Sequence, residues 1–279
     1  MSGPGVDPAD LLVRARSVLL DALEALTGHL DAVTVIGAQA IYLHTGGIDV
    51  ALAESTDDSD VAIDPRHLAD APRLESLMKN AGFVPSAKGQ PGSWVNADGI
   101  PVDLMVLEQL AGSGGRRGAR IPPHGKRATR RARGLEASLV DYERIDVTAL
   151  DPADERVIST NVAGPAALLV AKLHKIAERR TAPHRLNDKD AHDAYRILRA
   201  IATADLRARF VALLGDDLSE QVTKDALTYL DELFASGPDG LGATMAGRAE
   251  EGVGDPEQVS VAVSILTQDL LDALQPTTD

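Results

Sequence analysis

The chain has 279 residues, of which 44% are hydrophobic and 3% aromatic; it contains no cysteine and carries a formal net charge of −14. The absence of cysteine excludes disulfides and thiolate metal sites, and the acidic charge argues against a general nucleic-acid-binding protein. With neither a secretory leader pattern nor an apolar run long enough to span a membrane, we expect a cytoplasmic protein of one large domain or two ordinary ones.

The first predicted elements are a helix, a strand and a second helix. Leucines and valines at helical spacing predict an amphipathic helix from Asp10 to His29. Residues 32–36 predict a short buried strand, and a helix over 38–46 follows it directly through Gly37. Glycine at such a joint lets the backbone approach a phosphate, and the helix N-terminus offers free N–H groups.

Two acidic segments lie on predicted strands. Asp58 and Asp60 open a strand over 59–63; because residues two apart share a strand face, their side chains point the same way, about 6–7 Å apart. If the strand that carries Asp103 is a neighbour, three carboxylates converge and need a cation. Hard oxygen ligands without His or Cys favour Mg²⁺, which commonly carries nucleotide phosphates. The alternative for Asp58 and Asp60 is a solvated turn before a strand.

Several further elements complete an N-terminal α/β half. We expect a helix and four strand segments, one of which is a hairpin that turns at residues 96–99. In chain order they are a helix from Pro65 to Ala81 ended by Gly82, a strand over 83–86, the hairpin over 92–105, and strands over 143–149 and 155–162.

A basic insertion over residues 110–135 interrupts this half. It has no acidic residue and eight basic ones: Arg116, Arg117, Arg120, Lys126, Arg127, Arg130, Arg131 and Arg133. Its glycines and prolines predict a loop or short-helix insertion, for which a solvated or disordered loop is the alternative reading. Because it directly follows the strand that bears Asp103, it should lie at the rim of the acidic site. Arginines there would suit a polyanion such as RNA through phosphate contacts.

Helices dominate after Gly164. They are expected over 165–180, 188–203, 205–214, 217–235 and 256–274, with a mobile Gly-rich connection over 236–254 before the last. The predicted fold class is therefore α/β (α+β): a mixed sheet with helices in residues 1–163, and an all-helical C-terminal half in residues 164–279.

One helix of the C-terminal half carries two lysines on one face. Lys172 and Lys175 are three residues apart among Leu, Val, Ala and Ile. A lysine in such surroundings is costly to bury without an anion, and a triphosphate would be that anion. The alternative is that both lysines extend along the surface to solvent. If the buried charge were awkwardly placed, replacing Lys172 with alanine would cost little stability or none.

Several segments together resemble a known family. Val35-Ile-Gly-Ala-Gln-Ala-Ile-Tyr-Leu-His44, Ser55-Thr-Asp-Asp-Ser-Asp60 and Pro101-Val-Asp-Leu-Met105 resemble the core of the nucleotidyltransferase (polymerase-β-like) fold. The Thr-x-Asp-x-Asp form, followed by the lysine helix at 168–180 and the acidic helix at 189–198, is most similar to the AbiEii/MenT group of nucleotidyltransferase toxins. Two positions depart from the family pattern: Ala38 replaces the usual second Gly or Ser of the phosphate loop, and Glu54 replaces an Arg.

The resemblance implies a metal-dependent nucleotidyltransferase that uses a nucleoside triphosphate and Mg²⁺. It implies that Asp58, Asp60 and Asp103 hold the metal and that Lys172 neutralises the departing pyrophosphate. The nucleotide-binding positions it implies are Gly37, Ala38, Thr56, Lys172 and Asp190. Asp190 and Asp193 match the family's Asp-x-x-Asp motif, and either could pair with Lys172.

The expected acceptor is an RNA 3′ end, with tRNA first among the candidates. The toxin resemblance also implies a cognate antitoxin protein. The residues expected to contact the RNA are Arg116, Arg117, Arg127, Arg130 and Arg131. Two alternatives remain: a transferase that modifies a small molecule such as an aminoglycoside, and a non-enzymatic relic of the fold, against which the complete set of three aspartates weighs.

Overall fold

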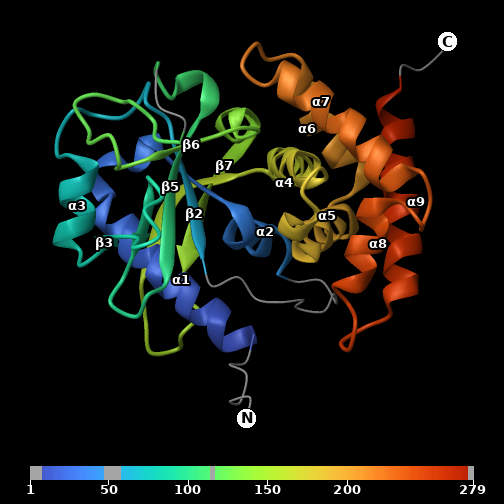
Figure 1. Ribbon diagram of the computed structural model, residues 1–279, viewed down its shortest axis with the longest axis horizontal. Helices are drawn as coiled ribbons and strands as arrows, with labels where there is room; N and C mark the ends of the chain where they lie inside the picture. Colours follow the sequence, from blue (N-terminus) through green and yellow to red (C-terminus); the bar gives the residue numbers. More distant parts are fainter. Residues whose placement is uncertain (1–7, 47–57, 114–116, 276–279) are drawn as a thin grey trace. The chain divides into compact units, whose positions relative to one another are not determined.

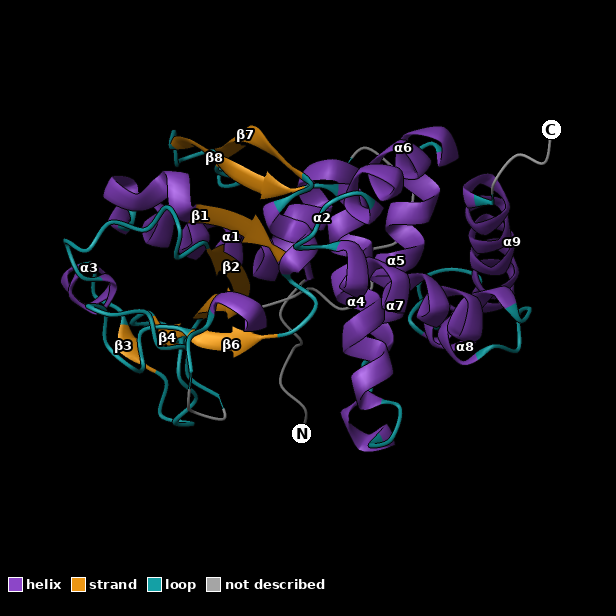
Figure 2. Ribbon diagram, turned by 90° about the horizontal axis from the view of Figure 1, so that it is seen from above, coloured by secondary structure: helices purple, strands orange, loops and turns teal. Residues whose placement is uncertain are grey.

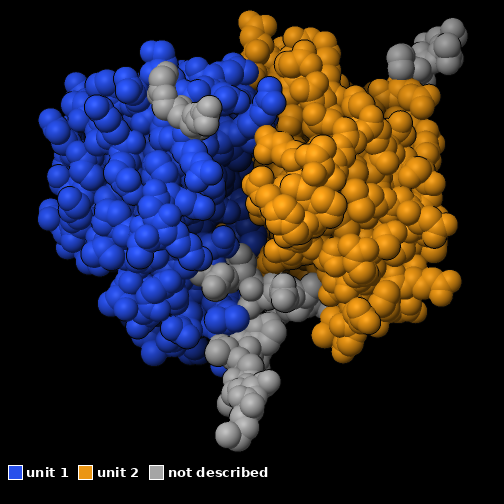
Figure 3. Space-filling model, in the orientation of Figure 1, with its two compact units in different colours: residues 1–40, 55–163 blue, residues 41–54, 164–279 orange. Residues whose placement is uncertain are grey.

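The computed structural model describes residues 8–46, 58–113 and 117–275. The chain divides into two compact units, one made of residues 1–40 and 55–163 and the other of residues 41–54 and 164–279 (Figure 3). The first contains a mixed sheet with helices, and the second is mostly helical (Figures 1 and 2). This is the fold class predicted from the sequence.

The sheet of the first unit contains eight described strands. They are β1 (Val33–Ile36), β2 (Ser59–Ile63), β3 (Val84–Pro85), β4 (Ser93–Val95), β5 (Pro101–Leu107), β6 (Arg130–Ala132), β7 (Tyr142–Thr148) and β8 (Val157–Ala163). Their order is β3-β4-β5-β2-β1-β8-β7, with β6 also paired to β5. The central pairs β2–β5 and β1–β8 are parallel, whereas β1–β2, β4–β5 and β7–β8 are antiparallel.

The hairpin β4–β5 forms where the sequence predicts it. The Asn96 carboxamide oxygen accepts hydrogen bonds from the backbone N–H groups of Asp98 and Ile100, which holds the turn together. Gly99 adopts a φ of +78°, a conformation that side chains disfavour. The local turn chemistry therefore fixes this part of the sheet.

Helix α1 (Pro8–Ala25) covers one face of the sheet. Its residues Leu19 and Leu23 are fully buried, and burial of such a side chain contributes about 1.5–3 kcal/mol. The Ser59 hydroxyl of β2 donates a hydrogen bond to the Ala15 carbonyl at 3.1 Å, so the Ser59 side of β2 faces α1. Because side chains alternate along a strand, Asp60 lies on the opposite face of β2.

Two of the predicted helices are shorter in the structure. The first ends at Ala25 and is followed by a 3-10 helix over Thr27–Ala32 instead of continuing to His29. The helix predicted from Pro65 to Ala81 exists only as α3 (Leu74–Asn80). Pro72 falls inside the predicted span, where a proline lacks the N–H that a helix interior uses. Gly82 does follow this helix, with a φ of +85°, as expected of a helix end.

The basic insertion is not only a loop or short helix, because it contributes strand β6 to the sheet. Ala119, Ile121 and Ala128 are buried within it, and the Trp94 indole N–H donates to the Ala128 carbonyl at 3.0 Å. A Cβ on Gly92 would lie 2.4 Å from the backbone nitrogen of Arg130. The insertion therefore packs closely against the β4–β5 hairpin.

The second unit is built mainly from helices. They are α4 (Pro165–Arg179), α5 (Asp188–Ala200), α6 (Thr203–Leu214), α7 (Glu220–Leu230), α8 (Leu241–Arg248) and α9 (Pro256–Leu274). A π-helical turn over Asp231–Ala235 extends α7. Helix α2 (Gly37–Thr45) begins directly after β1, and its residues from Ile41 onward belong to this unit. No helix among the described residues is long and apolar enough to cross a membrane.

The connection predicted to be mobile over 236–254 contains helix α8. Its glycines serve close packing: a Cβ on Gly242 would lie 2.6 Å from the Phe234 ring, and one on Gly247 would lie 2.2 Å from the Ser260 hydroxyl. Ser260, on α9, donates a hydrogen bond to the Ala243 carbonyl at 3.0 Å. The glycine content that suggests a flexible connection thus allows α8 to lie against α9 and Phe234.

Candidate functional site

Asp60 and Asp103 lie side by side on neighbouring strands. In the parallel pair β2–β5, Asp60 is directly opposite Asp103 in the register. Partners in register project from the same face of a sheet, and Asp60 is on the face away from α1. Their side chains are 21% and 14% exposed. The structure therefore brings two of the three predicted aspartates together at a partly accessible position.

The turn from β1 into α2 lies directly against the Asp60 carboxylate. Gly37 has a φ of +68°, and a Cβ at this position would be 2.5 Å from Asp60 Oδ2. Any larger residue would suffer backbone strain and would displace the carboxylate. Ala38, the second predicted phosphate-loop residue, is 8% exposed in the first turn of α2. The predicted glycine turn and the predicted acidic strand thus meet in one place.

Arg130 is the cation of this site. Its Nη2 lies 2.8 Å from Asp103 Oδ2 and 4.0 Å from Asp60 Oδ1, and its side chain is 32% exposed. Strand β6 holds it there, with Arg130 opposite Met105 in the parallel register with β5. The sequence analysis predicts that Arg130 contacts RNA. In the structure, Arg130 forms an ion pair with Asp103 and is part of the acidic site. The pairing was not foreseen because β6 was not predicted.

Asp58 does not complete a group of three ligands with Asp60 and Asp103. Within the described residues, no three Asp, Glu or His side chains are grouped closely enough to bind one metal ion. Asp58 precedes β2, whose pairing with β5 begins at Ser59, so the strand alternation used in the prediction does not govern its side chain. The expected convergence of three carboxylates is therefore reduced to two.

The remaining pair still suits Mg²⁺. This ion is usually held by one or two carboxylates, with waters and substrate phosphates filling its other positions. Asp60 and Asp103 supply two such hard oxygen donors, side by side on neighbouring strands. The residues present thus fit a divalent cation that arrives together with phosphates.

The other predicted contacts in the first unit have varied surroundings. Thr56 and Arg116 lie outside the described residues. Arg117 is exposed. Arg127 donates to the Gly89 carbonyl at 3.0 Å, and Arg131 donates to the Gly112 carbonyl and lies 3.9 Å from Glu108. Arg127 and Arg131 therefore help to hold the insertion together instead of only facing solvent.

A second group of charged side chains lies between α4 and α5. Lys172 Nζ lies 2.9 Å from Asp190 Oδ1 and 2.6 Å from Asp193 Oδ2, so the expected pairing of Lys172 with these aspartates is present. Lys175 bonds to Asp190 at 2.8 Å. Two residues not singled out from the sequence join them: Arg179 lies 3.3 Å from Asp190, and Lys189 lies 3.1 Å from Asp193. We call these six residues the helical charge cluster.

The helical spacing of the sequence explains this cluster. Lys172, Lys175 and Arg179 follow one another at intervals of three and four residues, which places them on one face of α4. Lys189 and Asp193 are separated by four residues on α5. This spacing, read across both helices, was the signal that could have identified Arg179 and Lys189 as members.

Four members of the cluster are buried, and both burial and mutual attraction shift their pKa values. They are Lys172, Lys189, Asp190 and Asp193. Burial lowers the pKa of Lys172, but Asp190 and Asp193 outweigh that effect and raise it above its usual range. Burial raises the pKa of Asp190, but the nearby lysines hold it well below its usual range, and Asp193 is shifted in the same direction. For Lys189, burial dominates and lowers the pKa. Four cationic side chains thus surround two carboxylates.

No family model, curated protein or solved structure matches the chain.

Proposed function

We propose that the chain is a Mg²⁺-dependent nucleotidyltransferase that transfers a nucleoside monophosphate from a triphosphate to an acceptor hydroxyl. The observation that carries this proposal is the placement of Asp60 and Asp103 in register, beside the glycine turn at Gly37. The resemblance of the three sequence segments to the polymerase-β-like nucleotidyltransferases supports the same reaction. A cysteine-free chain suits the reducing cytoplasm, where triphosphates and RNA occur.

In this proposal the residues of the first unit bind and orient the reactants. Asp60 and Asp103 would hold Mg²⁺, which neutralises charge on the triphosphate when it is bound. The backbone of the Gly37 turn lets a phosphate approach the start of α2. The acceptor oxygen attacks the α-phosphorus, the bond from the α-phosphorus to the bridging oxygen of the β-phosphate breaks, and pyrophosphate leaves. Asp103 would take the proton of the acceptor hydroxyl.

The helical charge cluster would supply positive charge for the phosphates. It has two more cationic groups than carboxylates, so an anion can bind it without first breaking every ion pair. Lys172 remains the residue proposed to neutralise the pyrophosphate, with Asp190 holding it in place. Its side chain is 9% exposed, whereas that of Lys175 is 42% exposed, which favours Lys175 as the first contact of an incoming phosphate.

The proposed acceptor is RNA, with a tRNA 3′ end as the first candidate and a cognate antitoxin as the regulating partner. The support is the excess of basic residues in the insertion together with the toxin resemblance. Arg117, Arg120 and Lys126 are exposed there and are the proposed phosphate contacts. Arg130 is not among them because it pairs with Asp103.

A small-molecule acceptor is the second candidate. The observation in its favour is that Arg127, Arg130 and Arg131 are each engaged with their own unit, which reduces the basic surface left for RNA. An amine-rich acceptor such as an aminoglycoside would instead be attracted by the neighbouring carboxylates of Asp60 and Asp103.

Incubation with each labelled nucleoside triphosphate, Mg²⁺ and either total RNA or an aminoglycoside tests the proposal. We expect label in RNA from one of the four triphosphates, with loss of that label in Asp60→Asn and Asp103→Asn. Asp98→Asn is the matched control, since Asp98 is an exposed acid on the hairpin turn of the same unit. Transfer at the parent rate in both site variants would remove the proposal, and label only in the aminoglycoside would select the second candidate.

A further inference from the structure

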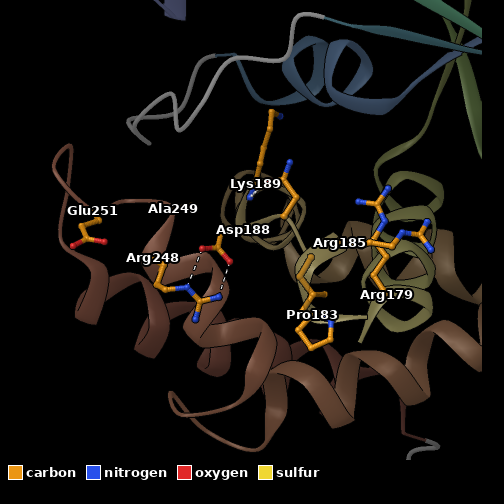
Figure 4. A pocket seen from close by; sticks show the side chains of 10 residues that line it. Arg179, Pro183, Arg185, Asp188, Lys189, Arg248, Ala249 and Glu251 are labelled. Carbon is orange, nitrogen blue, oxygen red and sulfur yellow. Dashed lines mark hydrogen bonds and ion pairs between the residues drawn. The ribbon is translucent and has the colours of Figure 1, made fainter. Parts of the chain in front are cut away.

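A pocket of about 980 Å³ lies within the helical unit (Figure 4). Its walls come from the end of α4, the 3-10 turn Pro183–Arg185, the start of α5 and the end of α8. The charged side chains that line it are Arg179, Arg185, Asp188, Lys189, Arg248 and Glu251. None of the described residues that line it is aromatic, so they offer no ring on which a base could stack.

The lining is cationic although the chain as a whole is acidic. Arg248 forms a two-point ion pair with Asp188, with hydrogen bonds of 2.7 and 2.9 Å, so these two charges compensate each other (Figure 4). Arg179 and Lys189 belong to the helical charge cluster, in which cations outnumber carboxylates. One wall of the pocket is therefore the edge of that positively charged cluster.

Arg185 adds a further cation that lacks a carboxylate partner among the described residues. It is exposed and lies on the turn between α4 and α5, where its N–H donates to the Ala182 carbonyl and the Leu186 N–H donates to that of Pro183. These bonds fix the turn from which Arg185 lines the pocket. Figure 4 draws the Arg185 and Arg179 side chains on the same side of the pocket.

We propose that this pocket binds phosphate groups. Arg179 already pairs with Asp190 at 3.3 Å, whereas Arg185 has no carboxylate partner among the described residues. The planar forks of both guanidinium groups match phosphate oxygens better than a lysine does. The N-terminus of α5, capped by Asn187, adds partial positive charge at the same place. Because none of the described lining residues is aromatic, we expect the pocket to recognise the charge of the phosphates and not a stacked base. The pocket shares Arg179 and Lys189 with the helical charge cluster, but its Arg185 has no part in the proposed transfer, and all of its residues lie in the helical unit.

The phosphates could be those of a free polyphosphate chain, as in a nucleotide, or those of an RNA backbone. Both present the same oxyanions to Arg179 and Arg185. A triphosphate concentrates its charge on one end of a small molecule, whereas RNA spreads single charges along a strand. The experiment therefore needs one probe of each kind.

Calorimetric titration of the full chain with inorganic tripolyphosphate at low salt tests the pocket. We expect Arg185→Ala to weaken binding about tenfold or more, as for loss of a charge-assisted hydrogen bond, and Arg185→Lys to lie in between. Arg180→Ala is the matched control: it removes the same charge five residues earlier, from a side chain that pairs with Glu232 and does not line the pocket. Thermal unfolding should be unchanged in both variants because both side chains are exposed.

Competition by a short 5′-phosphorylated RNA then shows which kind of molecule supplies the phosphate groups. If RNA displaces tripolyphosphate, and Arg185→Ala weakens the binding of RNA, the site is supported and its ligand is a nucleic-acid backbone. If tripolyphosphate binds and RNA does not displace it, the site is supported and its ligand is a free polyphosphate. Absence of tripolyphosphate binding to the parent protein, or equal affinity in Arg185→Ala and Arg180→Ala, would overturn the inference. Asp60→Asn should bind as the parent does, which separates failure here from failure of the transferase proposal.

Discussion

Each unit of the molecule contains a pair of aspartates in contact with basic side chains, but the two groups differ in their ratio of carboxylates to cations. Asp60 and Asp103 share one guanidinium, that of Arg130, and remain partly exposed. Asp190 and Asp193 share four cationic groups and are almost fully buried. Among the residues named, the first group contains more carboxylates than cations, and the second contains more cations than carboxylates.

The difference between the two groups helps to separate charges that stabilise the fold from charges that can bind a ligand. Buried carboxylates must be compensated because desolvation of a lone charge is costly, which accounts for Lys172 between Asp190 and Asp193. Compensation alone does not account for the additional cations around Asp190 and Asp193. The side chains of each group suit the ligand proposed for it: carboxylate oxygens at the sheet suit a divalent cation, and the cations at the helices suit phosphate oxyanions.

Loss of Lys172 should have the largest effect on stability. Because its ammonium compensates two buried aspartates, Lys172→Ala should lower the free energy of unfolding by about 3–5 kcal/mol. This reverses the expectation from the sequence alone, in which replacing Lys172 removes an awkwardly buried charge and costs little stability or none. Urea unfolding measures this change in the free energy of unfolding. Lys175→Ala, at a side chain 42% exposed, is the control and should cost less than about 1 kcal/mol; equal costs would show that the cluster is not organised around Lys172.

Acid should destabilise the helical unit through the same aspartates. The pKa values of Asp190 and Asp193 are lowered in the folded state, so below about pH 4 the unfolded chain takes up protons that the folded chain does not. Stability contributed by each carboxylate is present above its unfolded pKa and falls by about 1.4 kcal/mol per pH unit below it. Unfolding measured between pH 7 and pH 2.5 should show this decline, and Asp190→Asn should make it shallower. A stability independent of pH over that range contradicts the account.

Gly37 tests how tightly the sheet site is built. Gly37→Ala should cost about 1–2 kcal/mol from its positive φ and should also displace Asp60, since the new Cβ would lie 2.5 Å from Oδ2. Gly99→Ala separates the two effects, because Gly99 has a φ of +78° and a Cβ there meets no atom within 4 Å. We expect both variants to lose stability in chemical unfolding and only Gly37→Ala to lose metal affinity. Equal metal affinity in the two would show that Asp60 does not depend on the turn.

The smallest expected effect concerns the exposed basic side chains of the insertion. Replacing Arg117, Arg120 and Lys126 with alanine should weaken RNA binding and reduce its salt dependence by about one counterion per lost phosphate contact. Arg130 is kept in this variant because its loss would alter the acidic site as well. Filter binding at several salt concentrations measures the slope. An unchanged slope would show that the insertion packs against the sheet without contacting RNA, and would favour the small-molecule acceptor.

Local patterns predicted the elements that hold the sheet site. Strand β2 spans Ser59–Ile63 as expected, and the β4–β5 hairpin turns at the expected Asn96–Gly99 segment, because alternation and turn chemistry are short-range signals. The neighbourhood of Asp60 and Asp103 was only a conditional expectation, since parallel pairing joins strands far apart in the sequence.

Three features escaped prediction for identifiable physical reasons. Strand β6 is short and basic, so neither alternation nor hydrophobicity marks it, and its pairing with β5 is what carries Arg130 to Asp103. Helix α8 contains glycines that usually indicate a loop, but Gly242 here accommodates Phe234. The extent of the helical charge cluster depended on two helices meeting, which spacing within one helix does not determine.

Titration with Mn²⁺, followed by electron paramagnetic resonance as a substitute for Mg²⁺, tests the central claim most directly. The account predicts one site on the parent protein, weakened at least about tenfold in Asp60→Asn and in Asp103→Asn as a ligand loses its charge. Arg130→Gln should bind Mn²⁺ more tightly than the parent, because a competing cation at 2.8 Å from Asp103 is removed. Mn²⁺ binding that is unaffected by all three substitutions would contradict the assignment of Asp60 and Asp103 as the metal ligands.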